Sequence, residues 1–157
     1  MFLIPGVIPN YKTGPTSWPV TGYNGVGTPT TITGGQLVIP NTGTAAGTMV
    51  TPAGALAVTC IGVAANDGAA PRSSQDSQNP AVLSQQPDIV AVHYGVDIDV
   101  TYTTNVLAGA LIVCAAAGAV QDAAANVFGT IIGRCTQPGG VIFGTNPIGS
   151  ARIAGVI

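Results

Sequence analysis

The sequence holds few residues that could do acid–base chemistry. Its one histidine is His93, beside Tyr94. A Ser-His-Asp site needs a serine nucleophile in a recognisable setting, and the chain has no Gly-x-Ser-x-Gly turn. An isolated histidine of this kind is typical of a structural residue. We therefore expect no catalytic residue and no enzyme activity.

Asp97 and Asp99 stand two residues apart and would share one face of a strand. Two carboxylates there could pair on a calcium ion or serve a hydrolase. Calcium takes about six to eight oxygen ligands, so the backbone and water would have to supply most of them. We favour a solvated strand face with no metal, and keep a hydrolase using Asp97 and Asp99 as a weaker hypothesis.

The three cysteines, Cys60, Cys114 and Cys135, show neither Cys-x-x-Cys nor zinc spacing. We expect buried, reduced thiols that pack as small hydrophobic residues, which fits synthesis in a reducing cytoplasm. The segment 22–27 is glycine-rich, but its order is wrong for a dinucleotide loop and no Lys-Ser/Thr pair follows it. We therefore expect no cofactor.

The elements that would position these residues are predicted to be strands. Residues 96–103 alternate apolar and polar side chains, which indicates a half-buried antiparallel strand. Residues 109–120 indicate a strand, a turn of small residues and a second strand. The apolar run 55–65 predicts a long strand in which Gly62 marks a bulge or a close backbone approach.

Two parts of the chain show a weak internal sequence similarity, called here the echo. Gly35–Ile39 resembles Gly109–Val113, with Leu37 and Leu111 offset by 74 residues. Cys60–Val63 resembles Ile131–Arg134 in the same order, with an offset of 71. The echo indicates either a repeated β unit or convergent turn chemistry. Two copies are too few for a solenoid, which needs about three or more repeats.

Composition narrows the function class. Only 6% of the 157 residues are charged, against about 25% in an ordinary soluble domain. A free monomer with so few charged residues would be poorly protected against self-association. We therefore infer that neighbouring subunits cover much of its surface. The alternative is a secreted β protein with a polar, uncharged surface. The abundance of Gly, Pro and β-branched residues favours an all-β fold.

Several partners are not expected. The formal net charge is −2 and no basic run occurs, so the electrostatic footprint of a nucleic-acid binder is missing. No apolar stretch reaches the ~18 residues of a membrane span. Pro5 and Pro9 interrupt the apolar N-terminus, which also lacks a positive start, and we do not interpret it as a signal peptide.

Residues 1–33 predict an extended, Pro-rich N-terminal arm, and residues 34–157 a single β-rich domain. The arm holds half of the aromatic residues, whereas disordered tails are poor in aromatics. Tyr11, Trp18 and Tyr23 are therefore candidate contacts with a neighbouring subunit, the alternative being contacts within the same domain. The polar segment 67–87 predicts a solvated insertion or an exposed projection on an assembled surface.

Five segments follow one another in the order seen in a known protein family: Cys60–Ala70, His93–Val96, Leu107–Val113, Gly118–Val120 and Ile132–Arg134. In this order the chain, over roughly residues 35–157, resembles the small β-rich capsid decoration proteins of tailed bacteriophages, especially those of phages that infect actinobacteria. The segment after Ala70 is longer here, and the Pro-rich arm is not part of the pattern.

The resemblance implies a β-sandwich or β-barrel-like fold, no catalysis and a place on the outer capsid surface of the virion. Its implied partners are the major capsid protein and further copies of the chain in a homotrimer, which would cement neighbouring capsid subunits. On this resemblance Tyr11, Trp18 and Tyr23 become candidate contacts with the capsid as well. The alternative is a head-fibre base or adhesin-like module that binds a glycan through its 67–87 loop.

Overall fold

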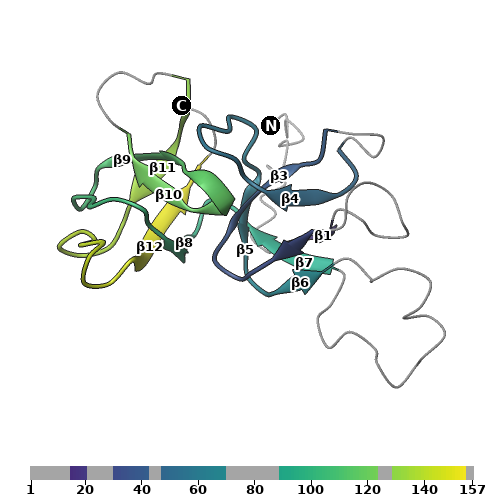
Figure 1. Ribbon diagram of the computed structural model, residues 1–157, viewed down its shortest axis with the longest axis horizontal. Helices are drawn as coiled ribbons and strands as arrows, with labels where there is room; N and C mark the ends of the chain where they lie inside the picture. The colour runs from purple at the N-terminus through teal and green to yellow at the C-terminus, as the bar shows by residue number, and fades with distance from the viewer. Residues whose placement is uncertain (1–14, 21–29, 43–46, 70–88, 124–128, 155–157) are drawn as a thin grey trace, which may run out of the picture.

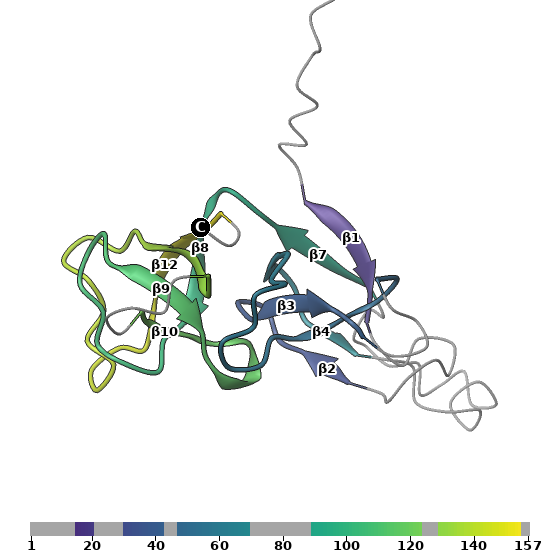
Figure 2. The ribbon, with the colours of Figure 1, turned by 90° about the horizontal axis from the view of Figure 1, so that it is seen from above.

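A computed structural model describes residues 15–20, 30–42, 47–69, 89–123 and 129–154. These segments form an all-β structure of two five-stranded antiparallel sheets that lie side by side (Figure 1). The N-terminal half of the chain builds one sheet and the C-terminal half builds the other, and the view from above separates them in the same way (Figure 2). The predicted β-sandwich or β-barrel-like fold is confirmed.

The first sheet has the strand order β1-β7-β5-β3-β4. Its strands are β1 (Thr16–Pro19), β3 (Leu37–Pro40), β4 (Val50–Pro52), β5 (Gly62–Ala64) and β7 (Ile89–His93). The two outermost strands, β1 and β4, are connected by a parallel bridge between Val20 and Val50. This bridge closes the sheet into a small barrel, called here the first barrel.

The second sheet has the order β10-β9-β11-β12-β8. Its strands are β8 (Asp97–Thr101), β9 (Leu111–Cys114), β10 (Val120–Asp122), β11 (Ile131–Cys135) and β12 (Ile148–Ile153). A parallel bridge between Tyr102 and Val120 again connects the two outermost strands. We call this closed sheet the second barrel.

The two barrels repeat one topology, strand for strand. If β1, β3, β4, β5 and β7 are matched to β8, β9, β10, β11 and β12, the two strand orders are identical. Backbone hydrogen bonds recur at matching positions: Gly35 N–H donates to Ala64 O at 2.7 Å, and Gly109 N–H donates to Cys135 O at 2.9 Å. Of the two explanations of the sequence echo, the structure supports a repeated β unit.

Glycines make the same close approach in both barrels. A Cβ atom on Gly62 would collide with the carbonyl oxygen of His93, and one on Gly133 would collide with that of Arg152. Gly62 pairs with Val38 and Gly133 with Ile112, which are matching positions of β3 and β9. The predicted close backbone approach at Gly62 is confirmed, and only a residue without a side chain fits there.

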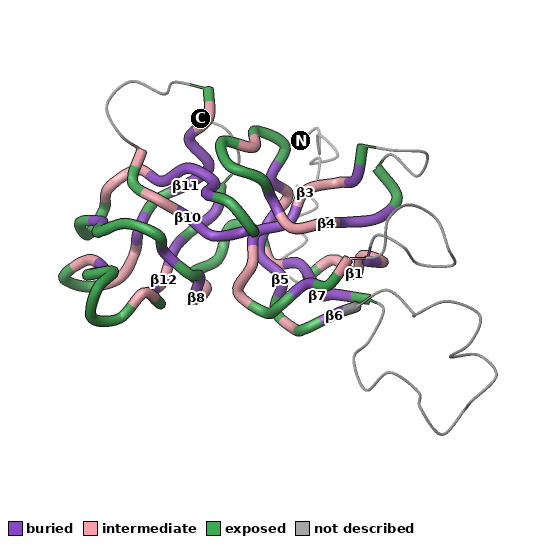
Figure 3. The backbone as a smooth tube through the Cα atoms, in the orientation of Figure 1, coloured by how far each residue is buried: buried purple, intermediate pink, exposed green. Residues whose placement is uncertain are grey.

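Two clusters of buried side chains form the core (Figure 3). One cluster fills the first barrel and includes Val38, Val50 and Val90. The other fills the second barrel but also takes in Leu37 and Val63, which are paired neighbours on β3 and β5. One face of the first barrel is therefore buried against the second barrel. At about 1.5–3 kcal/mol for each fully buried large aliphatic side chain, this contact stabilises the pair substantially.

The segment between β4 and β5 corrects the long strand predicted over 55–65. Only β5 is a strand there, and Leu56 has a left-handed backbone with φ of 57°. Leu56 N–H donates to Cys114 O at 2.8 Å, and Gly118 N–H donates to Ala53 O at 2.8 Å. The segment leaves the first sheet because it packs across the junction onto the second barrel. Tertiary contacts thus override a run of residues that favours a strand.

The boundary predicted at residue 33 also differs from the structure. β1 pairs with β7 over four residues, and β2 (Thr31–Ile32) pairs with β6 (Gly68–Ala69). Pro19 fits the outermost strand because an edge position needs no N–H donor on its free side. Residues 15–20 and 30–33 therefore belong to the first barrel, and the rest of the predicted arm, residues 1–14 and 21–29, lies outside the described residues.

Candidate docking surface

Asp97, one of the two carboxylates considered for a metal or catalytic pair, is bound by an arginine in the structure. Asp97 accepts two hydrogen bonds from Arg152, at 2.8 Å from Nε and 2.9 Å from Nη2. The Arg152 guanidinium holds the pKa of the Asp97 carboxyl below its usual value, and Asp97 raises the pKa of Arg152 in return. The described residues contain no group of three or more His, Cys, Asp or Glu side chains that could hold a metal. Both partners are exposed, so this ion pair stabilises the fold only weakly.

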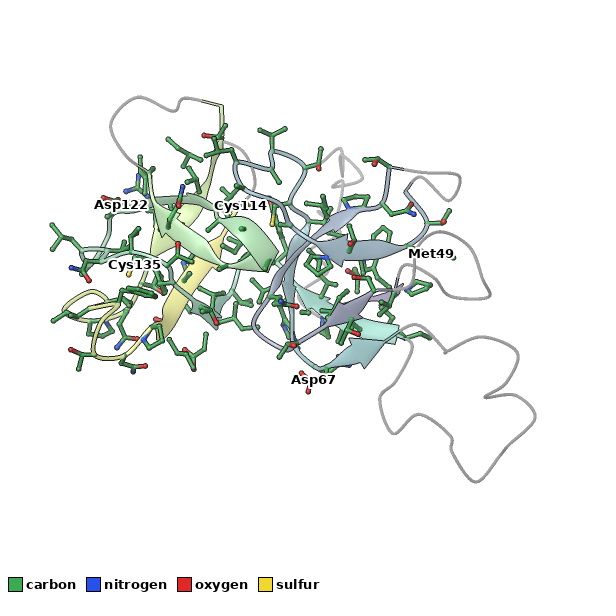
Figure 4. The ribbon with its side chains drawn as sticks, in the orientation of Figure 1. Met49, Asp67, Cys114, Asp122 and Cys135 are labelled. Carbon is green, nitrogen blue, oxygen red and sulfur yellow. The ribbon has the colours of Figure 1, made fainter. Side chains whose placement is uncertain are left out.

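The three cysteines are buried free thiols, as predicted. Cys114 and Cys135 lie in the second barrel (Figure 4), whereas Cys60 comes from the junction segment. The Cys60 and Cys114 thiols are hydrogen-bonding partners, which lowers the pKa of Cys60 and raises that of Cys114. These thiols pack the junction between the barrels. No helix among the described residues is long and apolar enough to span a membrane.

Of the three aromatic contact residues predicted from sequence, the structure describes one. Trp18 lies on β1, partly buried against the core of its own barrel, and its Nε1–H donates to Thr16 Oγ1 at 2.9 Å. Its ring therefore contributes to the first barrel itself. Tyr11 and Tyr23 lie outside the described residues, and a contact of any of the three with a neighbour stays a prediction.

The two exposed apolar side chains with the highest exposed fractions among the described residues lie together with a phenylalanine on the second barrel. Leu107 is 78% exposed, Ile142 is 64% exposed and Phe143 is 47% exposed. They are neighbours because Val106 and Val141 form an antiparallel bridge and Phe143 N–H donates to Asn105 Oδ1 at 2.9 Å. We call Leu107, Ile142 and Phe143 the apolar tip.

A shallow hollow of about 200 Å³ lies beside the apolar tip. Its lining consists of uncharged residues: Gln137, Gly140, Val141, Ile142, Thr145, Asn146 and Ile148. Such a hollow is too small for a typical ligand site, which takes about 300–1,000 Å³. An exposed apolar surface without charge is instead typical of the centre of a protein–protein interface.

Sequence reasoning missed the apolar tip. In the structure Val141 forms a bridge with Val106, and the next two residues, Ile142 and Phe143, are exposed. A signal was present: no charged residue occurs from Thr103 to Gln121 or from Thr136 to Ala151. A solvated loop would normally carry some charge in segments of that length.

Comparisons with known proteins find similarity at the level of fold. No protein-family model and no curated protein matches this sequence. Among solved structures, the chain is similar to the crystal structure of the N base of head fiber gp8.5 in bacteriophage phi29, with a TM-score of 0.57 and 10% sequence identity. The match covers 90% of this chain and 95% of that one, so the two-barrel arrangement as a whole has a counterpart in the base of a phage head fiber.

Proposed function

We propose that this chain is a structural protein of a tailed-phage head that binds the outer surface of the capsid. The observation that carries the proposal is the fold similarity, across nearly the whole of both chains, to the base of a phage head fiber. The decoration-protein resemblance of residues 35–157 leads independently to the same particle. The shortage of charged residues supports it further, because a surface held against neighbours needs little charge for solubility.

On this proposal the chain acts by binding alone, without catalysis or cofactor. Its partners are the major capsid protein and further copies of itself, in a homotrimer on the outer surface of the virion, after synthesis in the host cytoplasm. A symmetric oligomer repeats one weak contact several times, which raises its total affinity for a symmetric lattice. In the cementing form of the proposal, each copy bridges neighbouring capsid subunits.

A head-fibre base is the alternative, and the similarity to the phi29 fiber base favours it as strongly. The two roles differ in what binding does to the capsid. A cement holds capsid subunits together, whereas a fibre base needs only to be anchored. A fibre base also allows the 67–87 segment to contact a host glycan.

The experiment uses purified heads that lack this chain, prepared from the phage that encodes it. Purified chain is added, unbound protein is removed by sedimentation, and the temperature of genome release is measured. Binding with a higher release temperature supports cementing, and binding with an unchanged temperature supports the fibre base. Absence of the chain from the sedimented heads, at concentrations up to tens of micromolar, would overturn both.

A further inference from the structure

We infer that the apolar tip, formed by Leu107, Ile142 and Phe143, is the surface that seats the chain on an uncharged, apolar patch of the capsid shell. This inference rests on the proposed function and adds the contact site to it. All three side chains lie at one end of the second barrel, and two of them expose well over half of their surface.

The repeated barrel supplies an internal control for this exposure. The β2–β6 pair of the first barrel matches the bridge between Val106 and Val141, because Ile32 pairs with Gly68. The position that follows Ile32 is Thr33, where the second barrel has Leu107. The fold thus accepts a polar residue there, so it does not require the exposed leucine.

The same comparison covers Ile142. After Gly68 the first barrel has Ala69, where the second barrel has Ile142 after Val141. A threonine and an alanine in one copy of the unit thus stand against a leucine and an isoleucine in the other. Because the repeated unit folds without a large apolar side chain at either position, we assign Leu107 and Ile142, with the exposed Phe143 next to them, to a contact.

The chemistry of the tip defines its partner. A charged group pressed against it would lose its water without gaining a counter-charge, which is costly. The partner surface is therefore itself uncharged and apolar. The tip is also small: its exposed area is a few hundred Å², against the ~800 Å² that each partner contributes to a standard interface.

This small area favours a lattice over a second free copy as the partner. One such contact is too weak to hold a dimer in dilute solution, but several contacts made at once by an oligomer on a symmetric shell add up to firm attachment. A repeating capsid surface offers that arrangement, whereas a lone second copy does not.

The test replaces the tip with the residues of the first barrel at two positions, Leu107→Thr and Ile142→Ala, together with Phe143→Ala. The control changes two exposed apolar residues elsewhere, Val58→Thr and Ile89→Thr, which are 46% and 43% exposed, close to the value for Phe143. Apparent affinity for heads lacking the chain is measured by co-sedimentation, and thermal unfolding is followed by circular dichroism.

We expect the tip variant to unfold at the wild-type temperature and to bind heads at least tenfold more weakly, while the control variant binds as the wild type does. Equal binding by wild type and tip variant would overturn the assignment and leave the proposed function intact. Absence of binding by the wild type would instead overturn the proposed function. A mass in solution that rises with concentration for the wild type, but not for the tip variant, would show that the tip joins copies of this chain and would also overturn the shell assignment.

Discussion

The close glycine approach on β11 predicts that Gly133→Ala destabilises both barrels together. The added Cβ would collide with the carbonyl oxygen of Arg152, and its next contacts, at 3.0 and 3.1 Å, are also backbone atoms. Backbone cannot rotate away as a side chain can, so β11 and β12 must move apart. Overpacking of this kind costs about 1–3 kcal/mol.

Gly62→Ala makes the same collision in the first barrel and adds backbone strain. Its φ is 146°, a region that residues with side chains rarely adopt, which contributes about 1–3 kcal/mol more. We therefore expect Gly62→Ala to destabilise more than Gly133→Ala. Gly144→Ala is the control, because a Cβ there meets no atom within 4 Å, and we expect a change of less than about 0.5 kcal/mol.

The assay is urea unfolding followed by two probes, the fluorescence of Trp18 and far-ultraviolet circular dichroism. Trp18 is the only tryptophan and lies in the first barrel, whereas Gly133 lies in the second. Because one core cluster spans both barrels, we expect Gly133→Ala to lower the midpoint of both signals equally. An unchanged Trp18 transition in Gly133→Ala would refute the shared core, and a free energy of unfolding equal to that of the Gly144→Ala control would refute the close approach.

Four further predictions concern the Tyr102 hydroxyl, the buried thiols and the exposed ion pair. Tyr102→Phe should cost about 0.5–1.5 kcal/mol in urea unfolding, because it removes the hydrogen bond that the hydroxyl donates to Ser150 O at 3.0 Å. The carbonyl keeps its bonds from Thr136 N–H and Gln137 N–H, so the loss is no larger, and an unchanged free energy of unfolding would contradict a contribution from the hydroxyl. Burial raises the pKa of Tyr102 well above its usual range, so in an ultraviolet titration one of the four tyrosines should ionise only on unfolding. Ionisation of all four tyrosines in the native chain would contradict the burial of the Tyr102 hydroxyl. The three thiols should react with a thiol reagent only in denaturant, and fast native labelling would contradict their burial. Arg152 depresses the pKa of Asp97, so the stability from this pair is present above the usual aspartate pKa and is lost as pH falls through the depressed value. Asp97→Asn should remove only this small dependence of stability on acid pH. A large loss of stability at neutral pH would contradict the exposed, weak character of the pair.

Local patterns in the sequence predicted some elements well. The alternation over 96–103 corresponds to β8, and the run 109–120 corresponds to β9, the turn at Ala116–Gly118 and β10. The echo between Leu37 and Leu111 corresponds to the matching strands β3 and β9, and the echo between Cys60–Val63 and Ile131–Arg134 overlaps the matching strands β5 and β11. In each case the signal comes from residues whose neighbours in space are close along the chain or repeat at a fixed offset.

Other features depend on contacts that a pattern does not reveal. The run 55–65 has the composition of a strand, but Leu56 and its neighbours pack across the junction instead of pairing within the first sheet. β1 was assigned to the arm because prolines surround Trp18, yet an edge strand accepts proline. The apolar tip was missed because exposure, unlike hydrophobicity, is decided by the tertiary fold.

The equivalent faces of the two barrels differ in character. Leu37 and Val63 of the first barrel are buried against the second, whereas their counterparts on the second barrel are Leu111 and Arg134. Arg134 is exposed, and its Nη1 donates to Gly109 O at 3.2 Å. The two copies of the unit thus share a topology but not the chemistry of this face.

The central claim is that the chain occupies the outside of a phage head. Its most direct test is cryo-electron microscopy of heads of the encoding phage, with and without the chain. The difference map is predicted to show two-barrel density at fixed positions on the outer capsid surface, with the apolar tip of the second barrel against the shell. Difference density only inside the head or in the tail, or identical maps for the two particles, would contradict the claim.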